Sequence, residues 1–267
     1  MRLGVHIRIA DGLVKALDRA VELDCETVQL FSGNPNSWIR KPLDLEAAEM
    51  FASRTAELGI HPIILHTPYL VNLASPDDDT WEHSRAALAD AVSRAPHLGA
   101  TLIVTHIGSH RGAGYDVGIG RIGEAVRFAL DADPRPAVIL ELGAGAGNTI
   151  GSRFEHLADI FERLPDTDRV GICIDTAHLY GSGYDISTLE GVHAMFGELE
   201  RYVGLDRLKV VHLNDTLKAL GSHHDRHHHI GKGNVGEEGF RAIVNYPGTE
   251  GLPGIIETPG ESIEFDR

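Results

Sequence analysis

Cysteine, long apolar runs and positive charge are all scarce in this sequence. Its two cysteines, Cys25 and Cys173, are expected to be small core residues, which argues against a disulfide-rich scaffold and favours the cytoplasm. No run of about 18 apolar residues predicts a membrane span, and the N-terminus shows no signal peptide. Lys and Arg number 24 against 39 acidic residues, a net charge of −15. This charge argues against indiscriminate nucleic-acid binding, although bound cations can dominate the field locally.

Eight short apolar segments, most of them rich in Val and Ile, recur along the chain without strict polar alternation, as in strands buried on both faces. They are residues 3–7, 27–31, 62–66, 102–107, 137–142, 170–175, 208–213 and 254–257. Segments with helical periodicity separate most of them. These are residues 12–23, 45–58, 81–98, 122–130, 154–164, 189–203 and 237–244.

Strand followed by helix, repeated around eight strands, predicts an α/β fold of the (β/α)8 TIM barrel type. The alternative is a doubly wound sheet, but the turn at residues 6–12 lacks the glycine-rich phosphate motif that such a sheet usually shows. No linker or repeat divides the chain, so we expect one catalytic domain over residues 1–267. Only residues 261–267 follow the last strand and its turn, too few for a helix, so we expect the eighth outer helix to be lacking.

The segment 171–178 ends a buried strand in Asp175, with His178 three residues later on what we expect to be a short turn. Taken alone, it fits a strand-end aspartate that caps the next turn as well as it fits a metal site. Other strands end in the same way, and in a barrel these ends share one rim. The polar residues at the rim are His66, His106, Glu141, Asp175, His178, His212, Asp225, His227 and Glu257.

Five histidines and four carboxylates suit zinc, or zinc with manganese, and exceed what one ion binds at four to six ligands. We therefore expect two or three ions. Closely spaced divalent ions can activate a bridging water and stabilise both oxygens of an in-line phosphoryl displacement. The residues thus favour phosphate-ester hydrolysis.

Six motifs in order extend this interpretation: His66-Thr-Pro-Tyr-Leu-Val-Asn72, Thr105-His-Ile-Gly-Ser-His110, Cys173-Ile-Asp-Thr-Ala-His178, Val211-His-Leu-Asn-Asp215, Asp225-Arg-His-His228 with Ile230-Gly-Lys-Gly-Asn234, and Ile256-Glu-Thr-Pro259. Together they resemble the endonuclease IV family of apurinic/apyrimidinic endonucleases, within the xylose isomerase-like TIM barrels. The resemblance covers essentially the whole chain. It implies a DNA repair enzyme that cleaves the backbone 5′ to abasic sites in double-stranded DNA and trims blocked 3′ termini.

The resemblance also implies a trinuclear zinc site, with Mn2+ as an alternative at one position. His66 and His106 would hold one ion, and Glu141 would bridge it to a second. Asp175, His212 and Glu257 would complete the second site. The third ion would be bound by His178, Asp225 and His227. Catalysis would rest on Glu141, Asp175 and Glu257, and DNA would contact Asn36, Tyr69, Leu70 and Arg226.

Two departures from the family pattern concern the site. The segment after Glu141 reads Leu142-Gly-Ala-Gly145 where the family usually has Asn-Thr-Ala-Gly, which would loosen the orientation of Glu141. Asn36 stands where the family tends to have an arginine that enters the DNA stack. Tyr69 and Leu70, the wedge-like pair, are present, so we expect weaker penetration of the stack.

Two other functions remain open at this point. A one-metal set of Glu141, Asp175, His212 and Glu257 also resembles that of sugar isomerases and epimerases of the same barrel group, but it leaves five rim residues without a role. A binder of damaged DNA that has lost turnover through the changes near Glu141 and at Asn36 is the other. We expect a monomer without membrane association.

Overall fold

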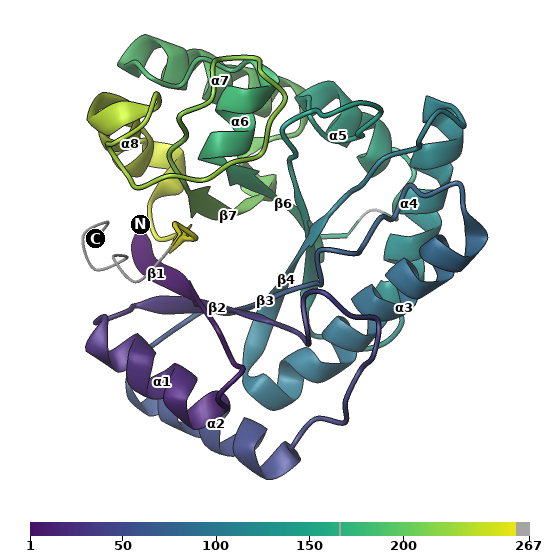
Figure 1. The fold of residues 1–267 in the computed structure, drawn as a ribbon, viewed down its shortest axis with the longest axis vertical. Coiled ribbons are helices and arrows are strands. Elements are labelled where there is room, and N and C mark those ends of the chain that lie inside the picture. The colour runs from purple at the N-terminus through teal and green to yellow at the C-terminus, as the bar shows by residue number, and fades with distance from the viewer. Residues whose placement is uncertain (166, 260–267) are drawn as a thin grey trace.

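Eight parallel strands close into a barrel in sequence order in the computed structural model, which describes residues 1–165 and 167–259 (Figure 1). Each strand pairs with its neighbours in the chain, and β1 pairs with β8. The strands are β1 (Arg2–Ile7), β2 (Thr27–Phe31), β3 (Ile63–His66), β4 (Ala100–His106), β5 (Ala137–Glu141), β6 (Val170–Asp175), β7 (Leu208–Leu213) and β8 (Pro253–Ile256). The expected TIM barrel is confirmed.

Helices connect successive strands and pack around the outside of the barrel (Figure 1). They are α1 (Leu13–Glu22), α2 (Leu45–Glu57), α3 (Asp78–Arg94), α4 (Tyr115–Leu130), α5 (Phe154–Phe161), α6 (Thr176–Ser182), α7 (Leu189–Tyr202) and α8 (Gly236–Val244). Short 3-10 turns are η1 (Ala95–Leu98), η2 (Leu205–Arg207) and η3 (Pro247–Thr249). In the part of the chain that the structure describes, no helix is long and apolar enough to cross a membrane.

Two apolar cores hold this architecture together. The larger one fills the space between the strands and the outer helices and includes Phe51, Phe154 and Phe196. The smaller one fills the barrel interior with one residue from each of six strands: Ile64, Val104, Ile139, Cys173, Val210 and Ile255. Because the barrel interior is a packed layer of side chains, it forms a rigid floor beneath the carboxyl ends of the strands.

The structure differs from the sequence-based expectation in three elements. The short turn expected after Asp175 is the seven-residue helix α6. Helix α4 begins at Tyr115, ahead of the expected residue 122, and α3 ends at Arg94 because η1, with Pro96 near its start, takes over. No helix follows β8 up to residue 259, and the expectation for residues 261–267 lies outside the described residues.

Candidate metal centre

The polar residues at the rim follow the apolar floor at a spacing of two residues. On six strands, an apolar residue of the barrel interior is followed two positions later by a polar residue of the rim. The pairs are Ile64 and His66, Val104 and His106, Ile139 and Glu141, Cys173 and Asp175, Val210 and His212, and Ile255 and Glu257. Side chains alternate between the two faces of a strand, so residues two apart point the same way. The pleat that sends the apolar residue into the barrel therefore sends the polar one to the inner surface just above it.

The first group of donors is His66, His106 and Glu141. His66 Nε2 lies 3.1 Å from Glu141 Oε2, and His106 Nδ1 lies 3.3 Å from the same oxygen. His66 and Glu141 are almost fully buried, whereas His106 is partly exposed. Two imidazoles therefore converge on one carboxylate oxygen.

The second group uses the other oxygen of Glu141. His212 Nδ1 lies 3.2 Å from Glu141 Oε1, 3.2 Å from Glu257 Oε2 and 3.9 Å from Asp175 Oδ2. All four residues offer donor atoms within 4.8 Å of one another. Glu141 thus lies between the first two groups, with one oxygen toward each.

The third group surrounds Asp225, on the loop between β7 and α8. Its Oδ2 lies 3.2 Å from His178 Nε2, and its Oδ1 lies 3.3 Å from His227 Nε2. Asp175 Oδ2 lies 3.6 Å from His227 Nε2, so Asp175 is shared by the second and third groups. Its other oxygen, Oδ1, accepts the backbone N–H of His178 at 2.9 Å and caps α6.

The hydrogen bonds of these histidines leave lone pairs facing carboxylate oxygens. Nδ1 of His66 donates to the carbonyl of Thr67 at 2.6 Å, and Nδ1 of His178 donates to that of Leu142 at 2.8 Å. A carbonyl only accepts, so Nδ1 must carry the proton and Nε2 of each neutral ring must be the acceptor. Buried acceptors that face each other across about 3 Å need a cation between them.

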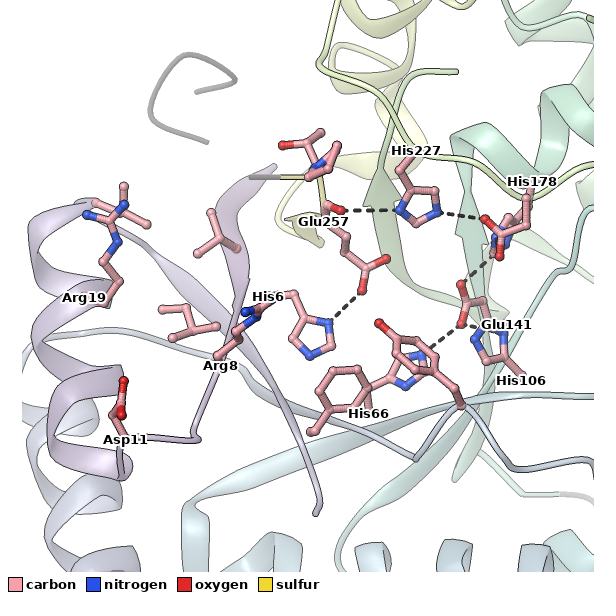
Figure 2. A pocket seen from close by; sticks show the side chains of 18 of the residues that line it. His6, Arg8, Asp11, Arg19, His66, His106, Glu141, His178, His227 and Glu257 are labelled. Carbon is pink, nitrogen blue, oxygen red and sulfur yellow. Dashed lines mark hydrogen bonds and ion pairs between the residues drawn. The ribbon is translucent and has the colours of Figure 1, made fainter. Parts of the chain in front are cut away.

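Histidine and carboxylate donors with such facing acceptors fit divalent metal ions. Nε2 of His178 and Nε2 of His227 are buried and lack a hydrogen-bond donor or acceptor of good geometry among the described residues. Neutral imidazole nitrogen and carboxylate oxygen are ligands typical of Zn2+. Figure 2 shows side chains from opposite sides of the barrel converging on this region.

In the metal-free protein, protons on histidines partly neutralise the charge of the buried carboxylates, as bound metal ions would. Burial alone would raise the pKa of Glu141, but His106 and His212 outweigh it and hold this pKa well below its usual range. Burial would lower the pKa of His227, but the carboxylates of Asp175 and Asp225 outweigh it and raise this pKa to about 9. Histidines that hold protons so tightly must release them when a metal binds.

Gln29 is a residue of the site that the sequence interpretation missed. Its Oε1 accepts from His212 Nε2 at 2.9 Å, and its Nε2 donates to Glu257 Oε1 at 2.8 Å. His6 Nδ1 lies 2.8 Å from the same Glu257 oxygen. Gln29 fixes the tautomer of His212 so that Nδ1 faces the second group, a role that outer-shell partners of metal ligands commonly fill.

Asn214 is the second missed residue, although it lies within a motif quoted above. Its Nδ2 donates to Asp175 Oδ2 at 2.6 Å, and its Oδ1 accepts the backbone N–H of Glu257 at 3.0 Å. The hydroxyl oxygen of Thr176 accepts the backbone N–H of Asn214 at 2.8 Å and so fixes the position of Asn214. Asn214 therefore sets the relative position of two carboxylates that reach the site from β6 and β8.

The loop that carries Asp225 and His227 is fastened by Asp215. This fully buried carboxylate accepts backbone N–H groups from Thr216, Gly233 and Val235 at 2.7, 2.9 and 3.0 Å. Backbone hydrogen bonds between Asp215 and His228 close the loop. Asp225 and His227 are thus held at defined positions although their loop has no regular structure.

Comparisons with known proteins agree with this geometry. Residues 17–266 match the model of the xylose isomerase-like TIM barrel family. The chain is 44% identical to "Probable endonuclease 4" of Chloroflexus aurantiacus over 100% of this chain and 94% of that protein. It is 43% identical to the protein of the same name from Methanoculleus marisnigri over 99% and 94%. Endonuclease IV from Thermus thermophilus superposes with a TM-score of 0.88 at 35% identity, covering 99% of this chain and 95% of that one.

The chain belongs to the endonuclease IV family. A D-tagatose 3-epimerase-like protein also superposes, with a TM-score of 0.72 at 19% identity over 97% of this chain and 92% of that one. At that identity the likeness shows a shared barrel and no more. The resemblance stated from the motifs is confirmed.

The residues that the endonuclease IV resemblance assigns to DNA lie on exposed loops around the centre. Tyr69 lines the same cavity as the donors, is 58% exposed, and packs edge-on against Phe31. Leu70 follows it and is 38% exposed. Asn36 and Arg226 are exposed and lie outside the lining of that cavity. The structure brings Tyr69 alone of these four into the cavity with the donors.

The departure at Leu142 has a defined structural consequence. Its side chain is buried in the apolar core, while its carbonyl accepts from His178 Nδ1. Glu141 itself is positioned by His66 and His212. An amide side chain is therefore absent next to Glu141, but the backbone at this position still orients a histidine of the third group.

Proposed function

We propose that this protein is a metal-dependent DNA repair endonuclease that hydrolyses the phosphodiester 5′ to abasic sites in double-stranded DNA. Trimming of blocked 3′ termini is the second part of the proposed activity. Membership of the endonuclease IV family supports it. The observation that carries it is the third donor group, because a single-metal sugar isomerase has no use for His178, Asp225 and His227. The two histidines converge with Asp175, and their Nε2 atoms lie 3.2 and 3.3 Å from the oxygens of Asp225.

The three donor groups would hold three ions, and zinc is the metal that their chemistry favours, with Mn2+ as an alternative at one position. His66, His106 and Glu141 would hold the first. Glu141 would be shared with the second group and Asp175 with the third. When bound, divalent ions lower the pKa of a water molecule and stabilise negative charge on phosphoryl oxygens.

The side chains around the ions would keep their ligands in place during the reaction. Gln29 and His6 hold Glu257, and Asn214 holds both Asp175 and Glu257. Each ligand is then preorganised, so little free energy goes into rearrangement as charge develops on the phosphate. At the mouth of the site, Tyr69 offers an exposed ring to an unstacked sugar or base.

Cleavage of a duplex with one tetrahydrofuran abasic analogue tests this proposal. The metal-loaded protein is incubated with the labelled duplex and with the same duplex without the lesion. We expect a single nick 5′ to the analogue, leaving a 3′ hydroxyl, and an intact control duplex. Release of a 3′-phosphoglycolate from a matched end tests the trimming activity.

A sugar isomerase would give the opposite result. The same preparation would convert a ketose to its epimer or aldose and leave the lesion duplex intact. A non-catalytic binder would retain the lesion duplex in a binding assay without producing a nick. Either outcome would contradict the proposed endonuclease activity.

A further inference from the structure

The cavity that holds the metal donors has two ends. One end is lined by the carboxylates and histidines of the donor groups, and the other end is lined mainly by basic residues. The volume of the cavity is about 930 Å³, and it extends from the rim histidines along β1 and along α1 as far as Leu23. The basic residues that line this end are Arg8, Lys15 and Arg19, and one acidic residue, Asp11, lies among them. Figure 2 shows Arg8, Asp11 and Arg19 on this side of the cavity.

Arg8 and Lys15 are exposed and without an ion pair in the structure described over residues 1–165 and 167–259. Many other arginines are engaged: Arg2 binds three backbone carbonyls, for example, and Arg19 pairs with Glu22 at 3.2 Å. The protein as a whole has a net charge of −15, so two cations without an ion pair in one cavity create a local positive potential that differs from the rest of the surface. They offer a local site for an anion.

Arg8 lies close to the proposed metal centre. It follows β1 two residues after His6, whose Nδ1 lies 2.8 Å from Glu257 Oε1. Arg8 lines the same cavity as Tyr69 and Glu257. Two residues of extended chain span about 7 Å, which is of the same order as the separation of successive phosphodiesters in a DNA strand.

We propose that Arg8 and Lys15 form a subsite for the phosphodiester next to the one that is cleaved, on the damaged strand. This inference rests on the proposed endonuclease function and names where a flanking part of that substrate binds. The guanidinium of Arg8 presents paired donors to two phosphate oxygens, and Lys15 adds a second charge from the first turns of α1. The subsite fixes the strand so that the neighbouring phosphate meets the metal centre.

None of the basic residues on the outer rim loops has this placement. Arg40, Lys41, Arg111, Lys218, Arg226 and Lys232 all lie outside the lining of the cavity. Those residues can strengthen attraction to DNA at a distance. Arg8 and Lys15, by contrast, share one cavity with the residues proposed to hold the reacting phosphate, so they act on position as well as on attraction.

The test compares Arg8→Ala, Lys15→Ala and the double variant with the wild-type protein, all metal-loaded, on the tetrahydrofuran duplex. Arg241→Ala is the matched control, because Arg241 is exposed on the outer helix α8, away from the cavity. We expect KM to rise about tenfold in the double variant with kcat within about twofold. The slope of log kcat/KM against log salt should become shallower by about one for each charge removed.

Neutral methylphosphonate linkages then locate the contact. They replace, one at a time, the phosphates on either side of the cleaved one in the damaged strand. At one flanking position the neutral linkage should raise KM for the wild-type protein and have little further effect on Arg8→Ala. If the neutral linkage raises KM equally for the wild-type protein and for Arg8→Ala at every flanking position, the proposed subsite is wrong.

The outcomes separate the two proposals. If the wild-type protein produces no nick, the endonuclease function fails and the subsite falls with it. If the wild-type protein cleaves and the double variant has the KM and salt slope of Arg241→Ala, the subsite alone is wrong. Metal content equal to that of the wild type confirms that each variant has retained the metal centre.

Discussion

Asp175 is placed to fill both roles that the sequence presents as alternatives, a helix cap and a metal ligand. Its Oδ1 caps α6 through the N–H of His178, while its Oδ2 faces Asn214, His227 and His212. A carboxylate has two oxygens, so a strand-end cap and a metal ligand can be the same residue. The cap also fixes the start of α6, the helix that carries His178. Asp175 therefore links the second donor group, to which it belongs, to the third group, which contains His178.

Glu257→Gln tests the ligand role at a single residue. The amide keeps the size of the side chain but removes the negative charge that the second group needs. We expect kcat to fall by more than about a hundredfold, with binding of the lesion duplex largely retained. Glu250→Gln, an exposed position at the end of η3, is the control. Near-normal turnover in Glu257→Gln would remove Glu257 from the ligands.

Gln29→Leu tests orientation by a residue that would not itself touch a metal. Leucine fills the space but leaves His212 Nε2 without its acceptor, so Nδ1 is no longer fixed toward Glu141. We expect metal affinity at the second group to fall about ten- to a hundredfold. Activity should return at high free zinc, measured by titration. Loss of activity that no zinc concentration restores would point to a folding defect instead.

At the level of elements, Asp215 anchors both ends of the loop between β7 and α8 by accepting backbone N–H groups from Thr216, Gly233 and Val235. Asp215→Asn places an NH2 group toward backbone donors and weakens a buried, charged network, at a cost of about 2–4 kcal/mol in folding stability. We expect loss of metal from the third group, with the first group retained, as measured by metal content and hydrogen exchange over residues 216–235. Asp206→Asn, at the opposite end of β7, serves as the control. A variant with unchanged metal content would show that the loop holds its position without this network.

The strands could be predicted from sequence because both barrel faces are apolar, which leaves continuous Val- and Ile-rich segments. The same pleat identifies most of the donor set, since six of the nine donors follow an interior apolar residue by two positions. Gln29 departs from this rule, because polar Thr27 stands two positions before it, but it carries another signal. It is the only glutamine in the sequence and lies in a buried strand, a costly place unless it is hydrogen-bonded. A lone buried glutamine therefore indicates a hydrogen-bonding role beside the site.

Other features could not be obtained from the sequence. Helix α6 was expected to be a turn, because its seven residues are too few to show an apolar period and its start depends on the Asp175 cap. The grouping of Asp225 with His178 and His227 follows from the family resemblance and not from the residues alone, because it depends on how Asp215 folds a long loop, which is a tertiary effect. The proximity of Arg8 to the centre follows from the closure of β1 onto β8.

At the scale of the whole molecule, the metal-free protein should lose stability as pH rises from about 6.5 to 9. The pKa of His227 is raised to about 9 from 6.5 in the unfolded chain, and the pKa of His178 is also raised, because carboxylates surround both residues and outweigh burial. Groups with a raised pKa stabilise the fold fully below their unfolded pKa and lose that contribution as pH rises through the folded value. Glu141 and Glu257, with lowered pKa values, stay ionised throughout this window.

Thermal melts of chelator-treated protein across this range measure the effect. We expect Tm to fall toward pH 9 without metal, and to change much less over the same range when zinc is present, since bound metal replaces the protons. A flat profile without metal would contradict the picture of a proton-filled centre.

The central claim is that three ions, held by three donor groups, are needed for cleavage beside an abasic site. Stepwise addition of zinc to the metal-free protein, with bound metal per chain and nicking of the tetrahydrofuran duplex measured on the same samples, tests it most directly. We predict that the nick 5′ to the lesion reaches its full rate only near about three bound zinc ions per chain. Full activity at one bound ion, or no nick at three, would contradict the account.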